Sequence, residues 1–149
     1  MHHYTESGLD NVYLVGGLEA RATPYGRAVS IHDTEGLHRA IGLWIVDSAK
    51  PINGAELRFL RIELELTQAA LACVLGTTEQ TLRLWEKGRK KAMPGPADRL
   101  VRAFYKELTT GDGSVKAMVE RLASLDQQAG GPVWMRETAG GWRAEAGVG

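Results

Sequence analysis

The chain has 149 residues, enough for one domain or for one small domain with an arm at each end. Its 18 Lys and Arg residues balance 18 Asp and Glu residues, which excludes a charge field over the whole surface as the means of attracting a polyanion. Hydrophobic residues make up 44% of the chain and charged residues 24%, which excludes the disordered class. Any binding to nucleic acid must therefore depend on a local basic patch.

Cysteine content and hydropathy indicate in which cellular compartment the protein is expected. The single cysteine, Cys73, excludes an internal disulfide and a zinc site built from the cysteines of one chain. The most apolar stretch, Ala40–Val46, is shorter than the roughly 20 residues that cross a membrane. The polar residues Met1–Tyr4 do not resemble a signal peptide. We therefore expect a cytoplasmic protein without a membrane partner.

Charge and pattern divide the chain into three segments, 1–53, 54–108 and 109–149. The first and last carry a small excess of acidic residues, whereas the middle has ten basic residues against seven acidic ones. Within it, residues 80–106 hold eight basic side chains and two acidic ones. The balanced total charge therefore conceals a basic segment.

The segment 1–53 reads as an arm of two or three short antiparallel strands followed by a helix. The β-rich runs Asn11–Val15 and Arg27–Ile31 are bounded by glycine and proline turn residues. Asp33 or Thr34 can cap a helix that ends before Pro51.

Residues 54–107 have helical periodicity throughout, with breaks at Gly76 and across Gly88–Pro96. After a linker at 109–113, the spacing of apolar residues from Val115 to Leu125 predicts one more amphipathic helix. The end of the chain reads as a hairpin around Gly140-Gly141. We predict a mainly α protein, α+β overall, with short β-hairpin arms at both termini.

Residues 68–85 have the spacing of a helix-turn-helix unit. Such a unit needs a small residue where the helices cross and a turn residue that tolerates positive φ, and Ala72 and Gly76 occupy those two positions. The apolar positions that face the other helix are Leu71, Leu75, Leu82 and Trp85. Thr67 can cap the first helix, and Thr77 or Thr78 the second.

If Leu82 and Trp85 point inward, the second helix presents a polar face that can enter a major groove. Gln80 can pair with adenine, Arg83 with guanine, and Glu79 can accept from cytosine N4. The predicted base-reading residues are Thr78, Glu79, Gln80 and Arg83. The predicted phosphate-binding residues are Thr67, Gln68, Thr77, Thr81, Lys87, Arg89, Lys90 and Lys91.

The stretch Leu66–Gly88 resembles the Xre-type helix-turn-helix of lambdoid phage repressors and many bacterial antitoxins. The resemblance covers roughly 54–106 and implies a five-helix core near 54–108. It implies that Gln68 binds phosphate and steadies the first base-reading side chain, and that base readers fall on Thr78, Glu79, Gln80 and Arg83 or Leu84. Glu79 departs from the amide common at that position in phage repressors.

The ending Trp85-Glu86-Lys87-Gly88 is similar to the antitoxin branch of this family. A β-rich leader, a helix and then this motif also resemble MqsA-type antitoxins. The zinc cysteines of that type are absent here, so this resemblance implies no metal site.

Other readings of the same residues stay open. Glu79, Arg83 and Lys87 are spaced as a charge ladder, which is common on solvated helix faces. Cys73 fits a small core residue, and the four histidines fit exposed or capping positions better than a metal site. We find no catalytic motif, and we expect Glu63 and Glu65 to be exposed at a helix end. We therefore expect neither an enzyme nor a cofactor.

Together these patterns predict a sequence-specific DNA-binding repressor. One motif covers one half-site, so a homodimer on a palindromic operator is expected, with a cognate toxin as a further partner. The interface candidates are Leu43–Val46, Trp134 and Trp142. The alternative is a protein-interaction module that keeps the helix-turn-helix only as a scaffold.

Overall fold

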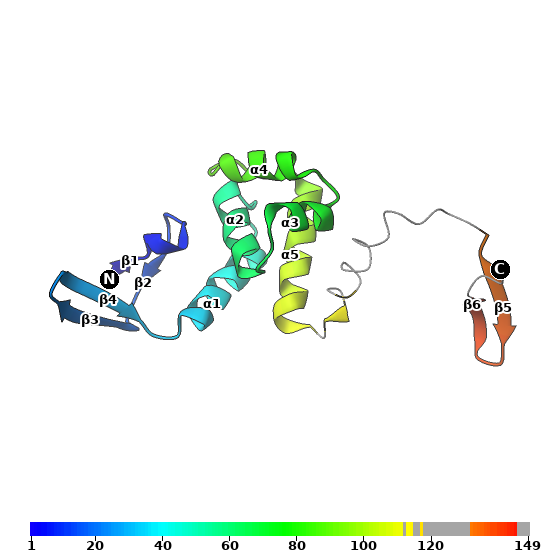
Figure 1. The fold of residues 1–149 in the computed structure, drawn as a ribbon, viewed down its shortest axis with the longest axis horizontal. Coiled ribbons are helices and arrows are strands. Elements are labelled where there is room, and N and C mark those ends of the chain that lie inside the picture. The colour runs from blue at the N-terminus through cyan, green and yellow to red at the C-terminus, as the bar shows by residue number, and fades with distance from the viewer. Residues whose placement is uncertain (112, 115–116, 118–131, 146–149) are drawn as a thin grey trace.

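A computed structural model describes residues 1–111, 113–114, 117 and 132–145 (Figure 1). The helices are α1 (Thr34–Asp47), α2 (Gly54–Glu63), α3 (Gln68–Leu75), α4 (Glu79–Lys87) and α5 (Gly95–Thr110), with a short 3₁₀ turn at Thr5–Ser7. The strands are β1 (His2–His3), β2 (Tyr13–Leu14), β3 (Leu18–Thr23), β4 (Gly26–Ile31), β5 (Trp134–Thr138) and β6 (Gly141–Glu145). This arrangement confirms the α+β class. Over the described residues, no helix has the length and hydrophobicity needed to span a bilayer.

The amino-terminal segment contains more strands than the sequence predicts. β3 and β4 form one antiparallel hairpin, in which Leu18 lies opposite Ile31, and β1 pairs with β2. The first segment therefore has four strands instead of two or three. The sequence Leu18–Thr23 carries a glutamate and an arginine, which weaken its β signal, but it pairs along its whole length with the adjacent β4.

The described residues contain five α-helices, but the predicted boundary at residue 54 does not enclose them. Four of them, α2 to α5, span 54–110, and the fifth is α1, which packs against α5 and α2. Ile41, Ile45 and Val46 of α1 are buried in the shared core. Of the proposed interface stretch Leu43–Val46, only Trp44 is largely exposed, at 55%.

Helix starts follow the predicted caps. Asp33 accepts a hydrogen bond from the Gly36 N–H at the start of α1, and Thr67 and Thr78 accept from N–H groups at the starts of α3 and α4. Asn53 and Glu56 form a reciprocal capping box at α2. Side-chain acceptors thus satisfy N–H groups that a helix start leaves without partners.

One hydrophobic core joins all five helices. Its fully buried members come from every helix and from the α1–α2 loop, and they are Ile45, Ile52, Leu57, Leu60, Leu71, Leu82, Val101 and Tyr105. Burial of each such aliphatic side chain contributes about 1.5–3 kcal/mol. Tyr4, Leu9 and Leu14 extend the core into the amino-terminal strands, which are therefore packed against the helices.

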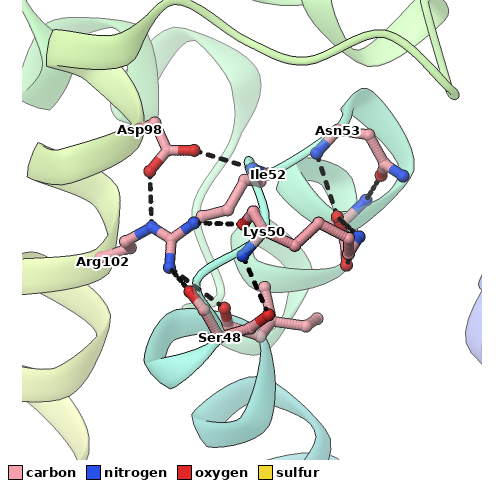
Figure 2. A network of polar contacts seen from close by, with 8 residues as sticks. Ser48, Lys50, Ile52, Asn53, Asp98 and Arg102 are labelled. Carbon is pink, nitrogen blue, oxygen red and sulfur yellow. Dashed lines mark hydrogen bonds and ion pairs between the residues drawn. The ribbon is translucent and has the colours of Figure 1, made fainter.

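Arg102 of α5 ties the end of α1 to the loop that leads into α2 (Figure 2). Its guanidinium donates to the carbonyl oxygens of Val46, Ser48 and Lys50, which the end of a helix and an irregular loop leave without other partners. It also pairs with Asp98 one turn earlier, and the other Asp98 oxygen accepts from the Ile52 N–H at 2.7 Å. The loop backbone is thus held by side chains of a distant helix.

The carboxyl-terminal strands β5 and β6 pair in the register expected for a hairpin, with Thr138 opposite Gly141. Trp134, Met135 and Trp142 are all more than half exposed. The predicted helix at 115–125 lies outside the described residues, apart from position 117.

Arg102→Ala should destabilise the fold by about 3 kcal/mol, because it leaves the buried Asp98 carboxylate without its cation and removes the donors to three carbonyls. Urea unfolding followed by circular dichroism measures this change. Arg99→Ala, at an exposed position of the same helix, is the control and should change stability by less than about 0.5 kcal/mol. Equal effects of the two changes would contradict the role given to Arg102.

Candidate nucleic-acid interface

The junction between α3 and α4 has the geometry that its sequence requires. Gly76 ends α3 in the left-handed region, with φ at 69°, and its N–H donates to carbonyls of the last turn. Ala72 is 2% exposed and Leu71 is fully buried where the two helices pack together. The small side chain at 72 and the glycine at 76 let the second helix turn sharply away from the first.

Helix α4 has one buried face and one open face. Leu82 is fully buried and Trp85 is half-buried, as predicted. In Figure 1, α4 crosses the top of the helical bundle, above α2 and α5. The exposed side chains of its cap and outer face are Thr78, Glu79, Gln80, Arg83, Leu84 and Lys87. All four predicted base-reading residues therefore lie on one open surface.

A buried ion pair fixes the rotation of α4 about its axis. Glu86 receives two hydrogen bonds from the Arg61 guanidinium of α2, at 2.7 and 3.0 Å, and the Glu86 and Arg61 side chains are only 5% and 15% exposed. Arg61 also donates to the Leu66 carbonyl at 3.1 Å. The bidentate pair disfavours other rotations of α4, since they would separate Glu86 from Arg61 and leave a poorly exposed charge without its partner.

Gln68 extends this polar cluster to the surface. Its amide donates to Glu86 at 3.3 Å, and its oxygen lies 3.5 Å from Nε of Arg83. Arg83 also pairs with Glu79 at 2.9 Å, one turn earlier on α4. The resemblance implies that Gln68 steadies the first base-reading side chain. In this structure Gln68 instead contacts Arg83, the last of the four predicted base readers. The Glu79–Arg83 pair is exposed, so opening it costs less than about 1 kcal/mol.

The other end of α4 is held by the first residue of α2. A Cβ atom at Gly54 would lie 2.2 Å from the Trp85 carbonyl oxygen, so α2 begins directly against the last turn of α4. The N–H groups of Gly54 and Ala55 donate to the carbonyls of Lys91 and Arg89. These hydrogen bonds hold the basic loop at residues 88–91, because the free N–H groups at the start of α2 donate to its carbonyl oxygens.

The predicted phosphate-binding residues differ in exposure and in whether they already have hydrogen-bond partners. Thr67 caps α3, and Thr81 is half-buried with its hydroxyl 2.8 Å from that of Thr78. Thr77 is also half-buried, and its N–H donates to the Ala72 carbonyl. Within the described residues, the exposed Lys87, Lys90 and Lys91 form no side-chain hydrogen bond or ion pair.

Arg89 has a partner that the sequence did not predict. Its Nη2 donates to the Gly8 carbonyl at 2.5 Å, which joins the basic loop to the amino-terminal arm. The contact spans 81 residues along the chain, so no local pattern could have indicated it.

Three smaller predictions were wrong. Cys73 is exposed, because Leu71 and Ala72 face the core and the next position of α3 points away from it. His38 is neither exposed nor a cap: its Nε2 lies 2.7 Å from the Tyr4 hydroxyl and its Nδ1 lies 2.8 Å from Glu63. Glu63 is half-buried for the same reason.

Burial raises the pKa of Tyr4, with smaller contributions from nearby carboxylates, so its hydroxyl stays protonated at neutral pH and can donate to His38. Nδ1–H of His38 can then donate to Glu63. This series of hydrogen bonds fastens the amino-terminal arm to α1 and α2.

Comparison with protein-family models, with curated proteins and with solved structures finds no match to this chain. Across the described part of the chain, no three His, Cys, Asp or Glu side chains are grouped so that they could hold a metal ion.

Gly54→Ala should lower stability by about 1–3 kcal/mol, because the added methyl group overlaps the carbonyl oxygens at the end of α4. Differential scanning calorimetry measures the change in Tm. Gly95→Ala is the matched control, since a Cβ there meets open space and Gly95 has no positive φ. A Gly54→Ala protein as stable as the control would show that α2 does not press on α4.

Proposed function

We propose that this protein is a sequence-specific double-stranded DNA-binding regulator that reads the major groove with α4. The observation that carries the proposal is the fixed, open polar face of α4, which no other described segment of the chain covers. Buried Leu82 and the Arg61–Glu86 pair hold the helix from below, so its outer side chains are oriented before a ligand arrives.

The basic segment supports this proposal electrostatically. Lys87 at the end of the open face and Lys90 and Lys91 just after it have no acidic partner among the described residues. Unpaired cations beside a base-reading helix can neutralise phosphates and release counterions. Glu79 is the acidic exception, and its pairing with Arg83 offsets that charge in the free protein.

One reading helix contacts one half-site, so the proposed binding unit is a homodimer on a palindromic operator. The proposed biological role is repression in the cytoplasm of the operon that encodes the protein, as an antitoxin or prophage-type regulator. Trp134, Met135 and Trp142 of the carboxyl-terminal hairpin are exposed apolar residues suited to contact with a second copy or a toxin.

Arg83→Ala and Gln80→Ala should each weaken binding to the preferred duplex by about 10- to 100-fold, because each removes one base contact. Fluorescence anisotropy measures the affinity, with the duplex selected from a random pool and with DNA from upstream of the gene. Arg21→Ala, at an exposed position of β3, is the control and should bind as the unchanged protein does.

Lys90→Ala and Lys91→Ala should weaken binding to all sequences alike and lower the slope of log K against log salt by about one each. The same anisotropy titration at several salt concentrations measures the slope. If selection enriches no sequence and binding is indifferent to salt and to these changes, the scaffold reading replaces the DNA-binding one.

A further inference from the structure

Within the described residues, the outer edge of strand β3 has no partner strand. β3 and β4 form a sheet of their own, and no third described strand pairs with either of them. From Glu19 to Thr23 every residue of β3 is exposed. In Figure 1 the hairpin extends away from the helical bundle, with β3 as its lower border. Such an edge presents a row of N–H and C=O groups to which another strand can pair.

One face of this hairpin is apolar as far as its tip. Side chains alternate along a strand, so the pairs on this face are Leu18 with Ile31, Ala20 with Val29, and Ala22 with Arg27. The first pair packs against the core, whereas the alanines and Val29 are exposed. A sheet of two strands is marginally stable in water, and three or more strands with an apolar face are needed for independent stability. The hairpin is therefore suited to extension into a larger sheet.

Symmetry restricts how the β3 edges of two copies can pair. In an antiparallel pair of identical strands, the twofold axis is perpendicular to the sheet, so every side chain stays on its own face. Paired residues must therefore have numbers whose sum is even, because only alternate residues of a strand share a face. A pair centred on Ala20 meets this requirement. It places Glu19 of each copy opposite Arg21 of the other, and Leu18 of each copy opposite Ala22 of the other.

The two charged side chains of β3 are available for such pairs. Arg21 forms no hydrogen bond or ion pair within the described part of the chain. Glu19 lies 3.7 Å from the exposed His32 and has no other charged partner there. Opposite charges directly across two strands stabilise a sheet, and like charges in the same place destabilise it. The charge pattern of β3 is therefore complementary to itself.

The other long strands lack this complementarity. Arg27 is the only charged residue in the sequence of β4. In β5, Arg136 and Glu137 are adjacent and so lie on opposite faces. In β6, Arg143 and Glu145 share a face, but Glu145 already pairs with Arg136 inside its own hairpin. Among the described strands, β3 is thus the best suited to pair with a second copy of itself.

We propose that two copies of this chain join through their β3 edges into a four-stranded antiparallel sheet, in the order β4–β3–β3–β4. Backbone hydrogen bonds between the strands supply the attraction, and the two Glu19–Arg21 pairs select the register. This inference rests on the homodimer of the proposed function and assigns it a surface. Its tests need no DNA.

Sedimentation equilibrium of the full chain measures self-association. Glu19→Arg and Arg21→Glu should each weaken it about tenfold or more, because each change places two pairs of like charges between the copies. The combined Glu19→Arg/Arg21→Glu variant restores opposite charges and should associate as the unchanged protein does. Glu137→Arg and Arg143→Glu make the same changes at exposed positions of the carboxyl-terminal hairpin and are the matched controls. Charge reversal is used because neutral Arg21→Ala removes only exposed ion pairs, which contribute little.

Mixing the two single variants tests the register directly. A Glu19→Arg copy facing an Arg21→Glu copy has opposite charges at both places, although each variant repels a copy of itself. Native mass spectrometry should therefore show a heterodimer in the mixture in preference to either homodimer. A mixture without this preference would contradict the proposed register.

Cross-linking locates the axis of the dimer. Ala20 lies opposite its own copy, where Cβ atoms of paired residues are about 4.5–5.5 Å apart. A bis-maleimide should therefore join two Ala20→Cys chains in solution. Ala28→Cys, at an exposed position of β4, is the control and should not be joined, and both variants carry Cys73→Ser because Cys73 is exposed.

Two outcomes would overturn the proposal. One is a protein that stays monomeric up to about 100 μM. The other is a dimer that is indifferent to both charge reversals, which would place the contact elsewhere, for example on the carboxyl-terminal hairpin. A chain that dimerises through β3 but binds no duplex would keep this surface and reject the base-reading role of α4.

Discussion

The buried pair between Arg61 and Glu86 is the interaction on which the arrangement of the candidate interface depends. It joins α2 to α4, holds the Leu66 carbonyl before α3, and supports Gln68 at the start of α3. A pair so poorly exposed adds little net stability, because desolvation offsets the attraction, but it penalises every orientation of α4 that would separate the charges. Orientation is what a base-reading helix requires, since its side chains must meet a groove of fixed geometry.

The helical core and the amino-terminal arm form a connected structure rather than separate modules. Arg102 of α5 holds the α1–α2 loop, and Gly54 at the end of that loop presses on the last turn of α4. The arm reaches the same region through Arg89 and the Gly8 carbonyl, and reaches α1 and α2 through Tyr4 and His38. These contacts therefore connect the arm, α5 and the α1–α2 loop to the helices that carry the candidate interface.

Local chemistry explains which parts could be predicted. The caps Asp33, Thr67 and Thr78 and the turn at Gly76 depend on residues within four positions of one another, and the structure confirms each. Burial of Leu82 follows from helical periodicity in the same way. The sequence did not predict strand β3, because its glutamate and arginine weaken the local β signal. Glu63 and Cys73 differ from the prediction because their surroundings depend on a segment distant along the chain and on the rotation of a helix against its neighbours.

The sequence by itself determined that α3 begins after Thr67 and ends at Gly76. It also determined that α4 begins after the Thr77-Thr78 pair and which side chains α4 exposes, because capping and helical periodicity act over a single turn. Only the tertiary structure decided that α1 completes the helical core, that Gln68 contacts Arg83, and that Arg89 donates to the Gly8 carbonyl. These features join residues 15 to 81 positions apart, and a pattern of neighbours carries no information about which distant side chains will meet.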